Sequence, residues 1–393
     1  MLKIERELVI MPTYKCPASC SNCGTNSSPK RKEVIALDMM KRYIEEAATL
    51  GFRIVVFSGG EATLRWRDLI RAISIAKDHH LPTRLVTNGF WAKSPDCAGK
   101  KLGELGAAGL DEINITTGQE HLRFVPMQSV VNLIGCVVSK SMDSVVNVEA
   151  TTKKEGEMIR DSLLRQITHI DEWQKEQRLK VILSPWVNIN SNTQPCKRIY
   201  DPTNWPIEVA GCDSILSTYT LRADGTLAAC CGLAMEDISE LVLEEGITLQ
   251  QAIKKAEGDV VKMAIRYIGP AKLLAMYLNH SDNEPHHNYT HQCQSCFAFY
   301  YDGKVREWFL NNHENIVESI IEHFVVDELI IPDILDNSAK GLSRTIINMS
   351  IRESKRRQLP WFPPYLMPSA AVWEKAPGAS FEGRYFLGSR GGR

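Results

Sequence analysis

Six strand-like segments alternate with helical segments between residues 7 and 187, and this alternation constrains the fold more than any other feature of the chain. Such alternation predicts an α/β protein built from βαβ units around a parallel sheet. Six units favour a partial (β/α)6 barrel of the TIM type over a flat doubly wound sheet, with chemistry at the carboxyl ends of the strands. The strand-like segments are Glu7–Met11, Arg53–Phe57, Thr83–Val86, Glu112–Thr116, Ser144–Glu149 and Lys180–Val187.

The composition is typical of a globular protein without a strong charge. Of 393 residues, 44% are hydrophobic and 24% charged, and the net charge is −1. This balance gives no field that would attract nucleic acid or an anionic membrane, and no run approaches the ~18 apolar residues of a membrane span. The first residues lack a signal-peptide pattern. Eleven cysteines then favour a reducing cytoplasm and metal or redox chemistry over a disulfide framework.

Three cysteines follow the first strand-like segment at the spacing C-x3-C-x2-C: Cys16, Cys20 and Cys23. Such a trio can supply three thiolates to one iron–sulfur cluster. A [4Fe–4S] cluster has four irons, so one iron stays open to a small molecule. A structural zinc site or scattered thiols are the alternatives, although zinc sites usually show paired C-x2-C motifs and four ligands.

This spacing resembles the signature of the radical S-adenosylmethionine (radical SAM) family. The resemblance implies the same (β/α)6 barrel. It also implies that SAM binds the open iron and is cleaved reductively to a 5′-deoxyadenosyl radical, which takes a hydrogen atom from a substrate. Gly59-Gly60-Glu61 resembles the family's second motif, GGEP, with Ala62 in place of the proline. Two glycines let the backbone approach a ligand closely, and the Glu61 carboxylate would pair with the methionine ammonium of SAM.

Polar residues at the other strand ends are further candidate cofactor-binding residues. Ser58 and Asn88 follow the second and third segments. Asn114 and Thr116 resemble the family's ribose-contacting positions and alternate onto one strand face. Glu149, at the end of the fifth segment, is a candidate for ribose or carboxylate contacts. Polar strand residues that are satisfied by their neighbours are an equally good interpretation.

Two further positions bear on the predicted cofactor site. Trp186 lines either the substrate mouth or the core. Asn22 stands where the family often has an aromatic residue that packs on the adenine. The adenine contact is therefore not defined by the motif.

A second cysteine group follows the predicted barrel: Cys212 and Cys230, with Gly225 between them, and the later pair Cys293 and Cys296. Residues 214–229 are expected to form a β-hairpin that turns at the glycine and brings Cys212 and Cys230 to neighbouring strand ends. The pattern resembles the twitch form of the SPASM/twitch branch, and this resemblance implies one auxiliary [4Fe–4S] cluster on the four cysteines. Zinc remains the alternative.

The remaining cysteines and histidines receive simpler interpretations. Cys231 is a substitute ligand, a spare thiol or, by resemblance to epimerases of this branch, a hydrogen-atom donor. Cys97, Cys136 and Cys196 are expected to be buried inert thiols. A histidine group before the second cysteine pair is expected to lie on a polar loop surface: His280, His286, His287 and His291.

The chain divides, by this interpretation, into a radical SAM barrel (1–200), an auxiliary-cluster domain (201–304) and a helical C-terminal extension with a mobile tail (305–393). Thr248 and Gln251 form a capping box at the start of a helix.

The resemblance favours modification of a ribosomally made precursor peptide by crosslinking or epimerisation. It also implies a flavodoxin- or ferredoxin-type electron donor. No leader-recognition domain is expected before Cys16, and this weakens the peptide hypothesis. The alternatives are dehydrogenation or epimerisation of a small molecule, such as a sugar, aminocyclitol or amino acid, and a non-catalytic iron–sulfur or zinc protein.

Overall fold

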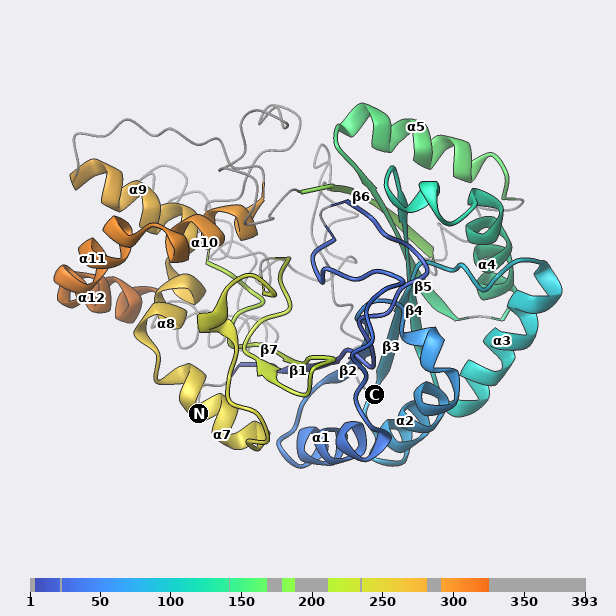
Figure 1. The fold of residues 1–393 in the computed structure, drawn as a ribbon, viewed down its shortest axis with the longest axis horizontal. Coiled ribbons are helices and arrows are strands. Elements are labelled where there is room, and N and C mark those ends of the chain that lie inside the picture. Colours follow the sequence, from blue (N-terminus) through green and yellow to red (C-terminus); the bar gives the residue numbers. More distant parts are fainter. Residues whose placement is uncertain are drawn as a thin grey trace, which may run out of the picture. The chain divides into compact units, whose positions relative to one another are not determined.

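The computed structural model describes most of the chain up to residue 324, and its contacts divide the chain into two compact units (Figure 1). Unit 1 comprises 1–207, 213–259 and 287–298, and unit 2 comprises 208–212, 260–286 and 299–393. The residues described are 4–21, 23–140, 142–167, 179–187, 211–233, 235–280 and 291–324.

Unit 1 contains an eight-stranded sheet in the order β6-β5-β4-β3-β2-β1-β7-β8. Strands β1 to β7 run parallel, and β8 pairs antiparallel with β7. The first six strands confirm the predicted (β/α)6 order. The strands are β1 (Glu7–Ile10), β2 (Ile54–Phe57), β3 (Thr83–Thr87), β4 (Glu112–Gly118), β5 (Asp143–Ala150), β6 (Leu179–Pro185), β7 (Thr218–Leu221) and β8 (Leu227–Ala228).

Helices α1 to α5 connect the six strands and follow one face of the sheet (Figure 1). Helix α3 begins earlier than its apolar pattern indicates, because Ser94 caps it and Pro95 occupies its first turn. The helices of unit 1 are α1 (Leu37–Thr49), α2 (Trp66–Asp78), α3 (Pro95–Ala108), α4 (Met127–Ser139), α5 (Lys153–Leu164) and α7 (Leu249–Glu257). The predicted capping box of α7 is present, with Thr248 and Gln251 bonded reciprocally.

The two ends of the sheet differ in chemistry. Near the amino ends of the strands, Arg53 contacts Glu7 at 2.7 Å and Arg84 contacts Glu112 at 2.7 Å. The strand midsections are buried on both faces, as in β1 and β2. The ion pairs therefore lie away from the carboxyl ends, where the predicted site residues are.

The predicted hairpin is present as β7 and β8, and Gly225 turns it with a φ of +89°. The sequence patterns did not indicate that β7 would pair with β1 and extend the barrel sheet. The predicted hairpin thus shares the sheet of residues 7–185. The predicted boundaries at 200 and 304 stay predictions.

Unit 2 is helical in its described part. Its helices pack through edge-to-face aromatic pairs, Tyr277 with Trp308 and Phe299 with Phe309. The helices are α8 (Val260–Tyr267), α9 (Pro270–His280), α11 (Gly303–Asn311) and α12 (His313–Phe324), and α10 (Gln292–Tyr301) ends in this unit. The predicted C-terminal extension is helical as far as residue 324, and the predicted mobile tail lies outside the described residues.

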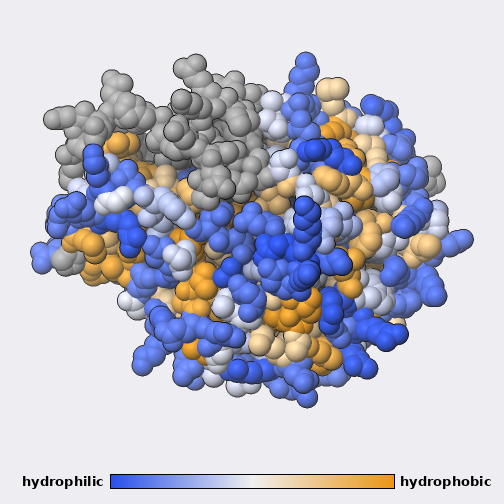
Figure 2. Space-filling model, in the orientation of Figure 1, coloured by the Kyte–Doolittle hydropathy of each residue, from blue (hydrophilic) through white to orange (hydrophobic). Residues whose placement is uncertain are grey.

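Hydrophilic side chains cover much of the face seen in Figure 2, with smaller apolar areas between them. Within the described ranges, no helix has the length and hydropathy needed to cross a membrane.

Gly118 closes the β4–β5 pair and permits a stability test. Its φ is +134°, and a Cβ atom there would lie 2.0 Å from the Glu149 carbonyl oxygen. We expect Gly118→Ala to lower the free energy of unfolding by about 3 kcal/mol, measured by urea titration. Gly135→Ala is the control, because Gly135 lies in α4 with nothing within 4 Å of an added Cβ. It should raise stability by about 0.5–1 kcal/mol, and equal losses in both variants would contradict the assignment.

Candidate functional site

The loop after β1 carries Cys16, Cys20 and Cys23, and all three thiols are free. Cys16 is buried and the other two are half-buried. The loop folds back on itself, with the Cys16 N–H donating to the Ser28 carbonyl at 3.2 Å and the Tyr14 N–H donating to the Glu33 carbonyl at 3.3 Å. These two backbone hydrogen bonds therefore hold the loop that carries the three cysteines.

The Gly59-Gly60 turn after β2 packs backbone to backbone on this loop. The Gly60 N–H donates to the Thr13 carbonyl and the Glu61 N–H to the Lys15 carbonyl, both at 2.9 Å. A Cβ on Gly59 would lie 2.7 Å from the Thr13 oxygen, and one on Gly60 would lie 2.4 Å from the Lys15 oxygen. The close approach that the glycines permit is thus to the cysteine loop.

Glu61 is buried, and protein donors already surround its carboxylate. Oε1 accepts from the Thr63 hydroxyl at 2.6 Å and the Thr87 hydroxyl at 2.9 Å, and Oε2 accepts from the Asn88 N–H at 3.0 Å. Burial raises the pKa of Glu61, while these donors oppose the rise. Glu61 therefore joins the β2 and β3 loops, and its predicted pairing with the ammonium of SAM stays a prediction.

Asn88 connects Glu61 to the cysteine loop. Its side-chain amide donates to the Cys16 sulfur at 3.6 Å, and its Oδ1 accepts from the Phe90 N–H at 3.0 Å. Ser58, at the end of β2, donates its N–H to the Ile10 carbonyl at 2.9 Å. Hydrogen bonds to cluster sulfurs tune reduction potential, so Asn88 is placed to affect a group held by Cys16.

The carboxyl ends of β4, β5 and β6 present a row of polar side chains. Asn114 and Thr116 share one face of β4, and the register places Asn147 of β5 beside Thr116. The Ser184 hydroxyl donates to Asn147 Oδ1 at 2.6 Å, and the Asn147 amide donates to Glu149 Oε1 at 3.1 Å. The buried Oδ1 of Asn114 has no hydrogen-bond partner among the residues that the structure describes. A ligand with hydroxyl groups would satisfy such a row.

His121, which the sequence patterns did not indicate, faces Glu149 with 3.4 Å between Nδ1 and Oε2. Neither atom has a hydrogen-bond partner in the described part of the chain. Burial raises the pKa of Glu149 to about 8 and lowers the pKa of His121 to about 4. Both groups are then neutral near pH 7, so this contact is not an ion pair. Sequence patterns did not indicate His121 because it lies in a short 3-10 turn after β4, outside any strand or longer helix.

Two hydrogen bonds to the backbone of Ser21 hold the tip of the cysteine loop. The Ser21 N–H donates to Glu120 at 2.9 Å, and the Trp186 indole donates to the Ser21 carbonyl at 3.0 Å. The Trp186 ring packs edge-on against His121 with centroids 5.6 Å apart. Trp186 thus anchors the loop and is half-exposed, and Asn22 lies outside the described residues.

The three thiols are of the donor type that binds iron–sulfur clusters. Burial is the main cause that raises the pKa of Cys16 and of Cys20 to about 12, and the neighbouring thiols add to it. Among the residues described, no three Cys, His, Asp or Glu side chains are gathered tightly enough for one ion. A [4Fe–4S] cluster takes one thiolate at each iron. Three free cysteines on one loop match that donor set.

The second cysteine group is partly assembled in unit 1. Gly232 lies beside two sulfurs, because a Cβ there would be 3.2 Å from Cys230 Sγ and 3.0 Å from Cys293 Sγ. Cys296 follows Cys293 by three residues in α10 and shares its side of the helix. Cys212 belongs to unit 2, where its N–H donates to the Ile265 carbonyl at 2.9 Å.

Two of the thiol predictions are wrong. Cys97 is exposed because it lies in the capped first turn of α3, and Cys136 is only half-buried. Cys231 is exposed, while Cys196, His286 and His287 lie outside the described residues. His291 is half-buried: its ring accepts from the Cys293 N–H at 3.1 Å, and burial lowers its pKa to about 4.

Residues 10–117 match the family model of the Radical SAM superfamily. This part of the chain is a radical SAM domain. The matched range contains the first cysteine trio, Gly59-Gly60-Glu61, Asn88, Asn114 and Thr116. Glu149, His121 and the second cysteine group lie outside it.

Curated relatives share the radical SAM part of the chain. The "Putative peptide biosynthesis protein YydG" of Bacillus subtilis (strain 168) is 27% identical over 125 residues, which is 30% of this chain and 38% of that protein. A "PqqA peptide cyclase" of Bradyrhizobium diazoefficiens is 32% identical over 105 residues, 26% of each chain. A "Probable GTP 3′,8-cyclase" of Methanopyrus kandleri is 36% identical over 112 residues, 28% of this chain and 34% of that protein. The chain thus spans about a quarter to two fifths of these relatives' lengths.

Two solved structures show weaker similarity. "Native anSMEcpe with bound AdoMet and Cp18Cys peptide" has a TM-score of 0.49 at 11% identity and covers 81% of this chain and 99% of its own. "Crystal structure of BtrN in complex with AdoMet and 2-DOIA" has a TM-score of 0.42 at 15% identity and covers 69% and 91%.

Glu149 gives the ligand-free protein a distinct pH dependence. Its folded-state pKa of about 8 lies above 4.5, so the folded chain holds the proton more tightly than the unfolded chain. The free energy of unfolding should therefore fall as pH rises between these two values. Glu149→Gln cannot ionise and should flatten this decline in urea titrations across the range. Glu245→Gln, at an exposed carboxylate, is the control, and a wild-type pH profile in Glu149→Gln would contradict the assignment.

Proposed function

We propose that this protein is a radical SAM enzyme. It cleaves S-adenosylmethionine reductively and uses the 5′-deoxyadenosyl radical to abstract a hydrogen atom from its substrate. The observation that carries this proposal is the loop of Cys16, Cys20 and Cys23 docked on the Gly59-Gly60 turn inside a radical SAM domain.

The chain's own residues take separable roles in this proposal. Cys16, Cys20 and Cys23 hold a [4Fe–4S] cluster, which supplies one electron to SAM when bound. Asn88 donates a hydrogen bond to the Cys16 sulfur.

The row of Asn114, Thr116 and Glu149 binds the ribose of SAM in this proposal. Asn114 Oδ1 is a buried acceptor without a partner within the described ranges, and a ribose hydroxyl would donate to it. Glu149 is a neutral acid near pH 7 and can both donate and accept.

The substrate class that we favour is a ribosomally made precursor peptide, modified by crosslinking or epimerisation. Two relatives carry names from peptide chemistry, a peptide biosynthesis protein and a peptide cyclase. A short open reading frame next to the gene would supply the peptide to test.

A small-molecule substrate is the second candidate. The specific observation behind it is the similarity to a protein named as a GTP cyclase. Sugar, aminocyclitol or amino-acid biosynthetic genes beside this one would favour it. A non-catalytic iron–sulfur or zinc protein, the third hypothesis, predicts no cleavage of SAM.

A second, auxiliary [4Fe–4S] cluster of the twitch type is part of the proposal. Support comes from the approach of Cys230 and Cys293 to Gly232 and from Cys296 on the same helix. The family resemblance adds Cys212 as the fourth thiolate, and zinc remains the alternative occupant. Cys231 is exposed beside this group, and a hydrogen-atom donor role for it rests on resemblance alone.

The proposed cellular compartment and electron donor follow from the cysteine and cluster chemistry. Cys16, Cys20 and Cys23 are free thiols, which suits the reducing cytoplasm. Reduction of the cluster requires an external donor of the flavodoxin or ferredoxin type.

Cleavage of SAM tests the proposed function directly. The anaerobically reconstituted protein should hold about eight irons if two four-iron clusters form, and it should release 5′-deoxyadenosine when SAM and dithionite are added. Cys16→Ala, Cys20→Ala and Cys23→Ala should abolish this release, because each removes a cluster ligand. Cys97→Ala, at an exposed thiol outside the site, should keep it. A fully loaded wild-type protein that releases no 5′-deoxyadenosine would favour the non-catalytic hypothesis.

The second cysteine group is tested at its ligands and at Gly232. Cys293→Ala should lower iron content to about four per chain while 5′-deoxyadenosine release persists. Gly232→Ala should do the same, because its Cβ would lie 3.0 Å from Cys293 Sγ and 3.2 Å from Cys230 Sγ. Gly135→Ala is the matched control. Unchanged iron content in Cys293→Ala would remove the second cluster from the proposal.

A further inference from the structure

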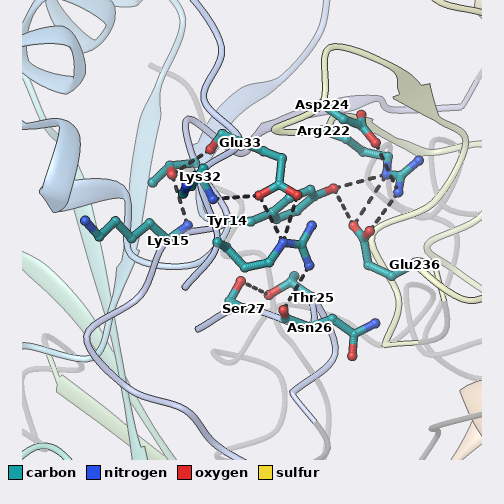
Figure 3. A network of polar contacts seen from close by, with 12 residues as sticks. Tyr14, Lys15, Thr25, Asn26, Ser27, Lys32, Glu33, Arg222, Asp224 and Glu236 are labelled. Atoms are coloured by element: carbon teal, nitrogen blue, oxygen red, sulfur yellow. Dashed lines mark hydrogen bonds and ion pairs between the residues drawn. The ribbon is translucent and has the colours of Figure 1, made fainter. Parts of the chain in front are cut away.

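Tyr14 connects the first cysteine loop to the segment after Cys230 (Figure 3). Its ring is 1% exposed, and its hydroxyl donates to Glu236 Oε1 at 2.6 Å. Tyr14 precedes Cys16 by two residues, and Glu236 follows Cys230 by six. One hydrogen bond therefore spans two segments that carry different cysteine groups.

Arg222, just after β7, completes this contact. Its guanidinium binds Glu236 Oε2 at 2.7 Å and donates to the Tyr14 hydroxyl at 3.2 Å. The side chains of Arg222 and Glu236 are 11% and 6% exposed. At a buried position, a well-packed apolar pair can stabilise the folded protein at least as well as an ion pair. Stability alone therefore does not explain why charged and phenolic groups are used here.

Tyr14 also contacts the Gly-Gly-Glu turn and the far side of its own loop. A Cβ on Gly60 would lie 2.7 Å from the Tyr14 carbonyl oxygen. The Arg31 guanidinium lies 4.5 Å from the centre of the Tyr14 ring and bonds to Glu33. The backbone of Tyr14 thus contacts the turn, and its side chain contacts Arg31 and Glu236.

A second contact joins the same two segments. A Cβ on Gly24 would lie 2.9 Å from Leu233 Cδ2, so Gly24 packs directly on Leu233. Leu233 follows Gly232, which lies against the sulfurs of Cys230 and Cys293. The loop that ends at Cys23 and the turn that begins at Cys230 therefore pack against each other through Gly24 and Leu233.

We propose that Tyr14, Glu236 and Arg222 form a positioning link that holds the loop at residues 16–21 and 23–24 and the turn at residues 230–233 and 235–236 in one fixed arrangement. Tyr14 is a positioning residue, since it acts through the loop. The consequence for the reaction rests on the proposed function: a displaced loop would move its sulfurs, and misplacement by about 1 Å can cost about a hundredfold in rate.

Hydrogen exchange of the reconstituted full-length protein, read by mass spectrometry, tests the link. Tyr14→Phe removes only the hydroxyl and should speed amide exchange about tenfold in residues 230–237 as well as in 14–28. Glu236→Gln should show the reciprocal effect on residues 14–28. Tyr43→Phe is the matched control, because Tyr43 is 1% exposed and its hydroxyl donates to the Ile247 carbonyl at 2.8 Å in another part of unit 1.

The rate of 5′-deoxyadenosine release from SAM and dithionite separates the link from the proposed function. We expect Tyr14→Phe to lose at least about tenfold in rate at wild-type iron content, and Tyr43→Phe to keep the rate. If Tyr14→Phe matches Tyr43→Phe in exchange and in rate, the link is overturned and the proposed function stands. If the loaded wild-type protein releases nothing, the proposed function fails and the exchange data still decide the link.

Discussion

The backbone contact between the Gly59-Gly60 turn and residues 13–15 sets the arrangement of the rest of the site. Two hydrogen bonds of 2.9 Å run between these segments, at a separation that any Cβ atom would prevent. Because the turn leaves β2, and β2 is paired in register with β1, the position of the cysteine loop follows from the sheet. Glu61, Ser21 and Tyr14 then fix the loop at three further points.

Local patterns predicted much of this structure. The six parallel strands, the loop after β1, the hairpin turn at Gly225 and the capping box of Thr248 and Gln251 each depend on residues close in sequence. The pairing of β7 with β1 and the bond from Tyr14 to Glu236 join residues more than two hundred positions apart. No period or motif encodes such a pairing. The exposure of Cys97 and Cys136 was predicted wrongly for the same reason, because it depends on neighbours that are distant in sequence.

Charge distinguishes the two ends of the strands. At the amino ends, Arg84 and Glu112 neutralise each other, although the buried Arg84 Nε and Ser144 Oγ there have no hydrogen-bond partner among the described residues. At the carboxyl ends, buried polar atoms of Asn114, His121 and Glu149 have no hydrogen-bond partner within the described chain. Folded proteins satisfy most buried polar atoms, so this end has bonding capacity that a ligand can use.

The position of β1 between β2 and β7 has a consequence for biosynthesis. The ribosome delivers β1 first, but one of its two edges finds its neighbour only when residues 218–221 have emerged. Pairings of such long sequence separation form slowly. Tyr14 likewise waits for Glu236. The nascent chain would therefore leave one edge of β1 unpaired until more than half of the 393 residues have been translated.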